Sequence, residues 1–233
     1  LGLEVVARAR AALAALEAVA ETVAAARDPL AGPLRFGVIP TVGPFLLPRL
    51  MPVLRESFPR LRLWLREDVT ERLVAQLQAG RLDLLLIALP IAPDPFLAAL
   101  PRGHHLAERE RVPVGALPAE PLLLLEDGHC LREHALDACG LPRLAPGPDS
   151  FAATSLHTLV QMVAGGLGVT LLPRLAVEGG VLNGAAVEVR PLEAETAPAR
   201  TLALAWRARS PRAAEFRGLA PAIAATVQAR LTA

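Results

Sequence analysis

Two cysteines are the residues of this chain whose type and spacing predict chemistry. Cys130 and Cys139 are the only cysteines in 233 residues, and both lie in the segment LLLLEDGHCLREHALDACG, residues 122–140. Asp-Gly-His at 127–129 predicts a turn, after which Cys130 opens a short helix that runs to Ala138. A thiol in the first turn of a helix lies at the positive end of the helix dipole, and a nearby His or Arg lowers its pKa further.

The spacing of the two thiols decides what a bond between them would do. If residues 130–139 are helical, the two Cα atoms lie about 13 Å apart, at a rise of roughly 1.5 Å per residue. A disulfide requires Cα atoms within about 7 Å of each other. Oxidation to a disulfide would therefore unwind the helix. Two alternatives stay open: two unrelated buried thiols, or a metal site of Cys130, His134 and Cys139, whose spacing is loose for such a site.

Length and composition restrict the class of protein. A chain of 233 residues is long enough for two lobes, its net charge of +1 indicates no particular partner, and it has no apolar run long enough to span a membrane. Charges at Glu4, Arg8 and Arg10 argue against a signal peptide. Two cysteines do not form a secreted disulfide framework, so we expect a cytoplasmic protein with reduced thiols. The chain begins at Leu1, which predicts a piece of a longer protein.

The first 27 residues predict one helix. Its apolar residues repeat at intervals of three and four, as in a coiled-coil seam: Val6, Ala9, Leu13, Leu16, Ala20 and Val23. Pro29, Gly32 and Pro33 end the pattern. We expect a linker helix that pairs with another chain, although an amphipathic helix on its own domain would show a similar pattern.

The next 60 residues alternate between strand and helix patterns. Strands are predicted at 34–39, 61–65 and 82–89, with helices at 45–56 and 70–80 between them. This order implies a parallel sheet covered by helices, with its ligand site beyond the carboxyl ends of the strands. Thr41 and Thr70 follow strand ends, so both should face one crevice; as an alternative, each caps a helix, with Thr70 as the N-cap of its helix.

A proline-rich stretch at 90–95 predicts a hinge into a second lobe with the same α/β plan. Its strands are expected at 96–100, 121–125, 169–172 and 201–206, with a helix at 154–164. A long terminal helix at 213–231 is expected to return to the first lobe and leave a cleft between the two.

Four segments together resemble the hydrogen-peroxide-sensing branch of the LysR-type transcriptional regulators. They are EDGHCLREHALDAC at 126–139, GPLRFGVIPTVGPFLLPRLMPVL from Gly32, ATSLHTLVQMVAGGLGVTLLP from Ala153 and PARTLALAWR from Pro198. The resemblance covers most of the chain, and the GHC motif with its cysteine spacing distinguishes this branch. It implies that Cys130 reacts with peroxide and that Cys139 resolves the product.

The same resemblance implies roles for four more side chains. Thr41 and Thr70 match threonines that position peroxide and water, Arg200 matches an arginine close to the reactive sulfur, and His129 matches the histidine before the reactive cysteine. Oxidation to a Cys130–Cys139 disulfide would remodel the domain and its dimer interface. The implied partners are hydrogen peroxide, further copies in a dimer or tetramer, DNA through a domain absent from this chain, and a reductant such as glutaredoxin or thioredoxin. No cofactor, metal or membrane partner is implied.

The fold expected from the resemblance is a two-lobed, periplasmic-binding-protein-like α/β regulatory domain with mainly parallel sheets, preceded by a linker helix. We expect the linker at 1–31, lobe I at 32–92 and 210–233, and lobe II at 93–209, with the winged helix-turn-helix absent. At 89–96 the family usually has a longer hinge and an extra strand, so either the loop is shortened here or several residues are missing from this sequence. Two other functions stay open: an effector domain that binds an organic ligand through Thr41, Thr154 and Ser155, and a thiol peroxidase.

Overall fold

The first lobe is built on three parallel strands. In this computed structural model, which describes residues 30–142, 152–193 and 198–231 and scattered positions from 2 to 19, β1 (Gly32–Val38) pairs with β2 (Leu61–Glu67) on one side and with the start of β3 (Leu84–Pro101) on the other. Helices α2 (Gly43–Ser57) and α3 (Thr70–Gln78) make the crossovers. The predicted β-α-β-α-β order is confirmed.

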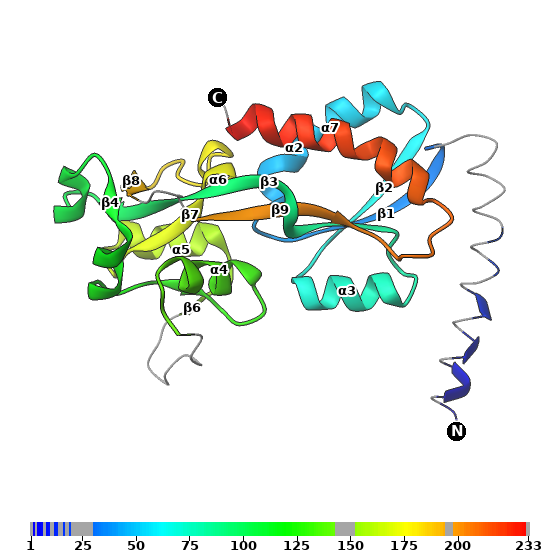
Figure 1. Cartoon of the computed structure of the whole chain (residues 1–233), viewed down its shortest axis with the longest axis horizontal. Helices are drawn as coiled ribbons and strands as arrows, with labels where there is room; N and C mark the ends of the chain where they lie inside the picture. The colour runs from blue at the N-terminus through cyan, green and yellow to red at the C-terminus, as the bar shows by residue number, and fades with distance from the viewer. Residues whose placement is uncertain are drawn as a thin grey trace.

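Helices cover both faces of this sheet, as Figure 1 shows: α2 and the terminal helix α7 (Ala213–Leu231) lie on one side and α3 on the other. Strands β1 and β3 are buried between these helices, with Leu34, Phe36 and Leu84 at most 1% exposed. Strand β2, at the edge of the sheet, is largely exposed, with Trp64 68% and Leu65 45% exposed. The predicted terminal helix and its return to the first lobe are therefore confirmed.

The lobes are joined by two long strands that run side by side (Figure 1). We predicted two strands with a proline-rich hinge between them, but β3 is one strand of 18 residues. It pairs antiparallel with β9 (Ala199–Ala205), and the register shifts between Ala88 and Ala92. Prolines are tolerated in a strand at such irregularities, where a missing N–H breaks no ladder bond. The proline-rich stretch therefore crosses between the lobes as part of a continuous strand.

The second lobe adds antiparallel strands to the far half of β3. Strands β7 (Thr170–Pro173) and β8 (Val187–Glu193) both pair with it, and β4 (Val112–Pro113) extends the sheet beside β8. The sequence did not lead us to predict β8. The strand predicted at 121–125 is reduced to β5 (Leu124–Leu125), which pairs with β6 (Ala152–Ala153). Gly168 approaches the Pro121 carbonyl so closely that a Cβ there would collide with it.

Short helices complete this lobe: η1 (His105–Glu108), η2 (Val114–Ala119), α4 (Cys130–Ala138), α5 (Leu156–Ala164) and α6 (Arg174–Glu178). The fold is thus the two-lobed α/β architecture that the resemblance implied. The described positions of the predicted linker are helical, and Leu13 and Leu16 on it are 60% and 67% exposed; the rest of residues 1–29 lie outside the described part. Within the described residues, no helix has the length and apolarity that a membrane crossing requires.

Candidate functional site

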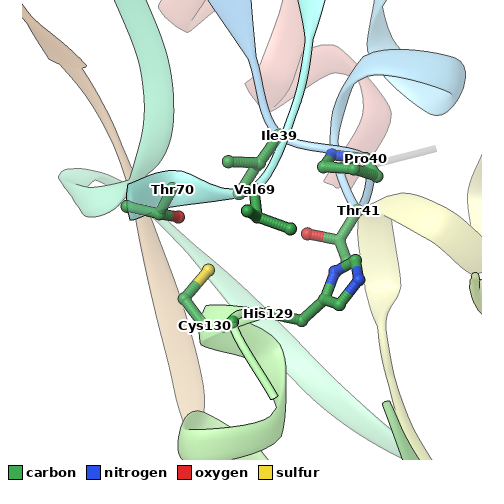
Figure 2. A pocket seen from close by; sticks show the side chains of 8 residues that line it. Ile39, Pro40, Thr41, Val69, Thr70, His129 and Cys130 are labelled. Carbon is green, nitrogen blue, oxygen red and sulfur yellow. The ribbon is translucent and has the colours of Figure 1, made fainter. Parts of the chain in front are cut away.

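A narrow pocket lies where the carboxyl ends of β1 and β2 meet the start of α4. Its empty space is about 170 Å³, part of it open to solvent, and its eight lining residues are Ile39, Pro40, Thr41, Val69, Thr70, Gly128, His129 and Cys130. The first four come from loops that follow the two strands, and Thr70 is the first residue of α3. Gly128 and His129 belong to the turn before α4, and Cys130 is the first residue of that helix. Figure 2 shows the Cys130 sulfur and the Thr41 and Thr70 side chains around the same space. The prediction that both threonines face one crevice is confirmed.

Cys130 is the first residue of α4, as predicted. His129 is the N-cap; its side chain makes no capping hydrogen bond, and its carbonyl accepts the Arg132 N–H at 2.9 Å. Cys130 therefore lies at the N-terminal end of the helix, where the helix dipole is positive. The thiol is half-buried and points from the helix toward Thr70 (Figure 2).

Cys139 lies at the opposite end of the same helix. It is the C-cap of α4, it is 8% exposed, and burial raises the pKa of its thiol. Both cysteines are free thiols. Because nine helical steps of about 1.5 Å separate their Cα atoms by about 13 Å, no disulfide can form while α4 is intact.

Helix α4 depends on its packing for stability. Its nine residues are too few for an isolated helix to be stable in water. Leu131, Ala135 and Leu136 bury its inner face, and Arg132 ties it to the preceding turn by an ion pair with Asp127 at 3.0 Å. A change that disturbs these few contacts would therefore unwind the helix.

Thr70 is not the N-cap that we predicted. The N-cap of α3 is Val69, and Thr70 is the first helical residue. Its Oγ1 atom is buried and has no hydrogen-bond partner among the described residues. A buried hydroxyl without a partner costs free energy, so this atom is a ready partner for a polar ligand in the pocket. Thr70 is therefore not a cap, and its expected role in binding stays a prediction.

Arg200 reaches the pocket through Thr41. Its Nη1 donates to Thr41 Oγ1 at 2.7 Å, its Nη2 donates to the Thr41 carbonyl at 2.9 Å, and its Nε donates to Asp94 at 2.9 Å. The Arg200 side chain is fully buried and is not part of the pocket wall. The expected place of Arg200 directly beside the sulfur stays a prediction, while its contact with Thr41 is part of the structure.

His129 lies beside Thr41 in the pocket (Figure 2). It is 7% exposed, and burial lowers its pKa from the usual 6.5, against a smaller opposite effect of Glu126. Its imidazole is therefore neutral at pH 7 and can accept a proton, but it adds no positive charge beside the thiol. The end of α4 is then the nearer source of positive potential.

The two other candidate sites share only Thr41 and Cys130 with this pocket. Thr154 is exposed, and Ser155 caps α5 by accepting the Thr158 N–H at 3.2 Å. Among the residues that the structure describes, the side chains close enough to share a metal ion are not the Cys130 set but His104 and His105, at the start of η1, and Glu120, the C-cap of η2.

Sequence reasoning missed Asp94, which binds Arg200. It is one acidic residue inside a proline-rich stretch, and its partner on β9 is far away in the chain, so no local pattern marked it.

Comparison with known proteins agrees with this geometry. The model of the LysR substrate binding domain family matches residues 27–227. The DNA-binding transcriptional dual regulator OxyR of Escherichia coli K12 is 40% identical over 96% of this chain and 76% of its own length. A probable hydrogen peroxide-inducible genes activator of Streptomyces viridosporus is 42% identical over 95% of this chain and 74% of its own length.

Solved structures give the same result. The reduced regulatory domain of OxyR2 from Vibrio vulnificus matches with a TM-score of 0.76 and 38% identity, over 85% of this chain and 97% of that one. A cysteine-to-serine mutant of Corynebacterium glutamicum OxyR with H2O2 bound matches with a TM-score of 0.84 and 29% identity, over 99% of this chain and 76% of that one. This chain therefore belongs to the LysR substrate binding domain family and, within it, to the group of OxyR regulators.

Proposed function

We propose that this chain is the redox-sensing regulatory domain of a transcription factor and that hydrogen peroxide oxidises Cys130. The observation that carries the proposal is the pocket itself. It places the thiol at a helix N-terminus beside Thr41, the unpartnered Thr70 hydroxyl and a neutral imidazole, and the second cysteine lies at the far end of the same short helix.

The chemistry has two steps. The Cys130 thiolate attacks one oxygen of peroxide, the O–O bond breaks, and the other oxygen leaves as hydroxide and takes up a proton to become water. The sulfur is oxidised by two electrons to a sulfenic acid. The Cys139 thiolate then attacks that sulfur, the S–S bond forms, and the sulfenic oxygen leaves as a second water.

The second step requires that α4 unwind. Burial keeps Cys139 protonated by raising its pKa, and the helix holds the thiols apart. Unwinding solves both problems at once, because it exposes Cys139 and lets the chain bring the sulfurs together. Reorganised contacts around α4 would then change the dimer or tetramer interface, and with it the placement of DNA-binding domains outside this chain. A cytoplasmic disulfide reductant such as glutaredoxin or thioredoxin would reset the sensor.

Mass spectrometry under non-reducing conditions after peroxide treatment tests the proposal. We expect a Cys130–Cys139 disulfide in the wild type, no reaction at residue 139 in Cys130→Ser, and a trapped sulfenic acid at Cys130 in Cys139→Ser. Each single variant serves as the control for the other. Unchanged peroxide reactivity in Cys130→Ser would refute the assignment.

The two other functions fit the structure less well. An organic effector requires a pocket of roughly 300–1,000 Å³, whereas the empty space beside Cys130 amounts to about 170 Å³ even when the part open to solvent is counted. The effector hypothesis predicts a ligand-dependent rise in melting temperature that oxidation of the thiols does not affect. A thiol peroxidase would consume peroxide in steady state with a reductant. We propose a sensor and not an enzyme, since the OxyR relatives in E. coli and other bacteria are named as transcriptional regulators and gene activators.

A further inference from the structure

Two opposite charges are fully buried where the chain crosses between the lobes. Asp94 on β3 and Arg200 on β9 face each other in the antiparallel register, and Arg200 Nε lies 2.9 Å from Asp94 Oδ2. Neither side chain has any exposed surface. Burial of an ion pair costs several kcal/mol per ion in lost hydration, and an apolar pair of similar size is often as stable. Stability alone therefore does not account for this pair.

Each residue of the pair also forms hydrogen bonds with one of the two lobes. The second oxygen of Asp94, Oδ1, accepts the Leu175 N–H at 2.9 Å, at the start of α6 in the second lobe. The two terminal nitrogens of Arg200 donate to the side chain and the carbonyl of Thr41, at 2.7 and 2.9 Å, in the loop between β1 and α2. One chain of hydrogen bonds thus runs from α6 through Asp94 and Arg200 to the wall of the pocket.

The direction of these hydrogen bonds determines what Thr41 can do. A guanidinium has only donors, so the Thr41 oxygen must accept the bond from Arg200. A hydroxyl carries one proton, and the bond to Arg200 leaves that proton to be donated elsewhere. Thr41 lines the pocket together with Cys130, and Figure 2 shows its oxygen turned toward the space in front of the thiol. The contact with Arg200 therefore makes the Thr41 hydroxyl a donor into the pocket.

We propose that Asp94 is a positioning residue for the oxidation of Cys130. It holds the guanidinium of Arg200 in the orientation that fixes the rotamer and the donor direction of the Thr41 hydroxyl. During the attack of the Cys130 thiolate, negative charge develops on the peroxide oxygen that leaves. A preorganised donor at that oxygen stabilises the charge without giving up its own proton. This inference rests on the proposed function, because it concerns the same peroxide reaction.

The first test is the variant Asp94→Asn in the full chain, which keeps the shape of the side chain and removes its charge. Two second-order rate constants are measured at Cys130: oxidation by hydrogen peroxide and alkylation by iodoacetamide. Loss of a direct oxyanion donor typically costs 10²–10³-fold in rate, so an indirect loss through two side chains should cost about tenfold. We expect the peroxide rate to fall by about that factor and the alkylation rate to change less than twofold, since alkylation requires the thiolate but no donor to a leaving oxygen.

A matched control separates positioning from general damage. Asp83 is also a buried carboxylate paired with an arginine, Arg35, but it lies in the first lobe and does not line the pocket. Asp83→Asn should lower the melting temperature and leave the peroxide rate unchanged. If Asp94→Asn behaves in the same way, with a lower melting temperature and a wild-type peroxide rate, the positioning role is refuted.

A double-mutant cycle with Thr41→Val tests the route of action. If Asp94 acts through Thr41, Asp94→Asn should slow peroxide oxidation little or not at all when Thr41 is already valine. If the double variant instead loses peroxide rate by the product of the two single-variant factors, the two residues act independently and the proposal is overturned.

If Asp94→Asn does not fold, the charge-free pair Asp94→Leu with Arg200→Met replaces it, since apolar substitution of a buried ion pair is often tolerated. That double variant should lose as much peroxide rate as Thr41→Val, and a wild-type rate would again overturn the proposal.

The wild type distinguishes failure of this inference from failure of the proposed function. If the wild-type chain forms no sulfenic acid at Cys130 with peroxide, the proposed function itself is wrong. If the wild type reacts and Asp94→Asn reacts equally fast, only the positioning role of Asp94 is wrong.

Discussion

Unwinding of α4 is the step on which the disulfide switch depends, and its energy can be changed at one exposed position. Glu133 is exposed on this helix, and Glu133→Ala and Glu133→Gly both remove its side chain. Any contact of the glutamate is lost equally in the two variants. What differs is helix stability, which is lower with Gly than with Ala by about 1 kcal/mol.

This energy difference has two measurable consequences. If the sulfenic acid waits for α4 to unwind, the disulfide should close about fivefold faster in Glu133→Gly than in Glu133→Ala, since about 1.4 kcal/mol corresponds to tenfold in rate. The disulfide should also be harder to reduce in the Gly variant, by about 20 mV, because reduction must re-form a weaker helix. Rapid mixing with peroxide, acid quenching and mass spectrometry give the closure rate, and equilibration in glutathione buffers gives the potential.

A control and a refuting result complete the experiment. Ala225→Gly makes the same exchange at an exposed position of α7. It should lower the free energy of unfolding by a similar amount and leave the closure rate unchanged. If the two Glu133 variants close at one rate although their helix stabilities differ, or if Ala225→Gly also accelerates closure, then unwinding of α4 does not limit disulfide formation.

Two further predictions concern stability. Burial lowers the folded-state pKa of His129 from its usual 6.5, with Glu126 opposing this effect, so the unfolded chain takes up the proton first as the pH falls. His129 should therefore not affect the free energy of unfolding above its unfolded pKa, and that free energy should fall as the pH drops through about 6.5 toward the folded pKa. Urea titrations near pH 7.5 and 5.5 measure the fall, which should be smaller in His129→Gln than in the wild type. An equal fall in the two proteins would contradict this cause. Asp83 accepts three hydrogen bonds from Arg35, whose side chain is 31% exposed, so Asp83→Asn should cost about 2 kcal/mol in urea unfolding, less than the roughly 3–5 kcal/mol of a fully buried pair. As a comparison, Arg66→Gln removes an exposed ion pair and should lower the free energy of unfolding by at most about 1 kcal/mol. Equal losses of stability in Asp83→Asn and Arg66→Gln would contradict the burial argument.

The two buried carboxylates, Asp83 and Asp94, differ in what they connect. Asp83 and its arginines tie β1, β3 and the end of the chain together within the first lobe. The Asp94–Arg200 pair instead spans the crossing and contacts a loop of one lobe and a helix of the other. A repacking of the lobes after oxidation would therefore strain the second set of contacts before the first.

Local pattern was enough to determine most of the elements and the reactive helix. The helix at 213–231 has the bounds that its apolar pattern predicted, and Cys130 opens α4 because the turn residues before it stop the preceding strand. Periodicity identifies such elements because each one buries a face whose repeat is written in neighbouring residues. It fails where neighbouring residues conflict: Pro191 obscured β8, which is mostly half-buried, and the prolines of β3 predicted a break where the strand continues.

Only the tertiary structure showed which side chains and hydrogen bonds come together at the pocket. The sequence left Thr70 either in the crevice or as the cap of α3; it is the first residue of the helix, and its buried hydroxyl has no partner among the described residues. Asp94 and Arg200 are 106 residues apart, and Arg200 and Thr41 are 159 apart, so no local pattern could join them. The antiparallel register of β3 and β9 brings Asp94 opposite Arg200, and the crossover through α2 brings Thr41 within reach. The sequence determines which residues are present, but the hydrogen bonds of Arg200 with Asp94 and Thr41, which form only in the folded chain, orient the Thr41 hydroxyl.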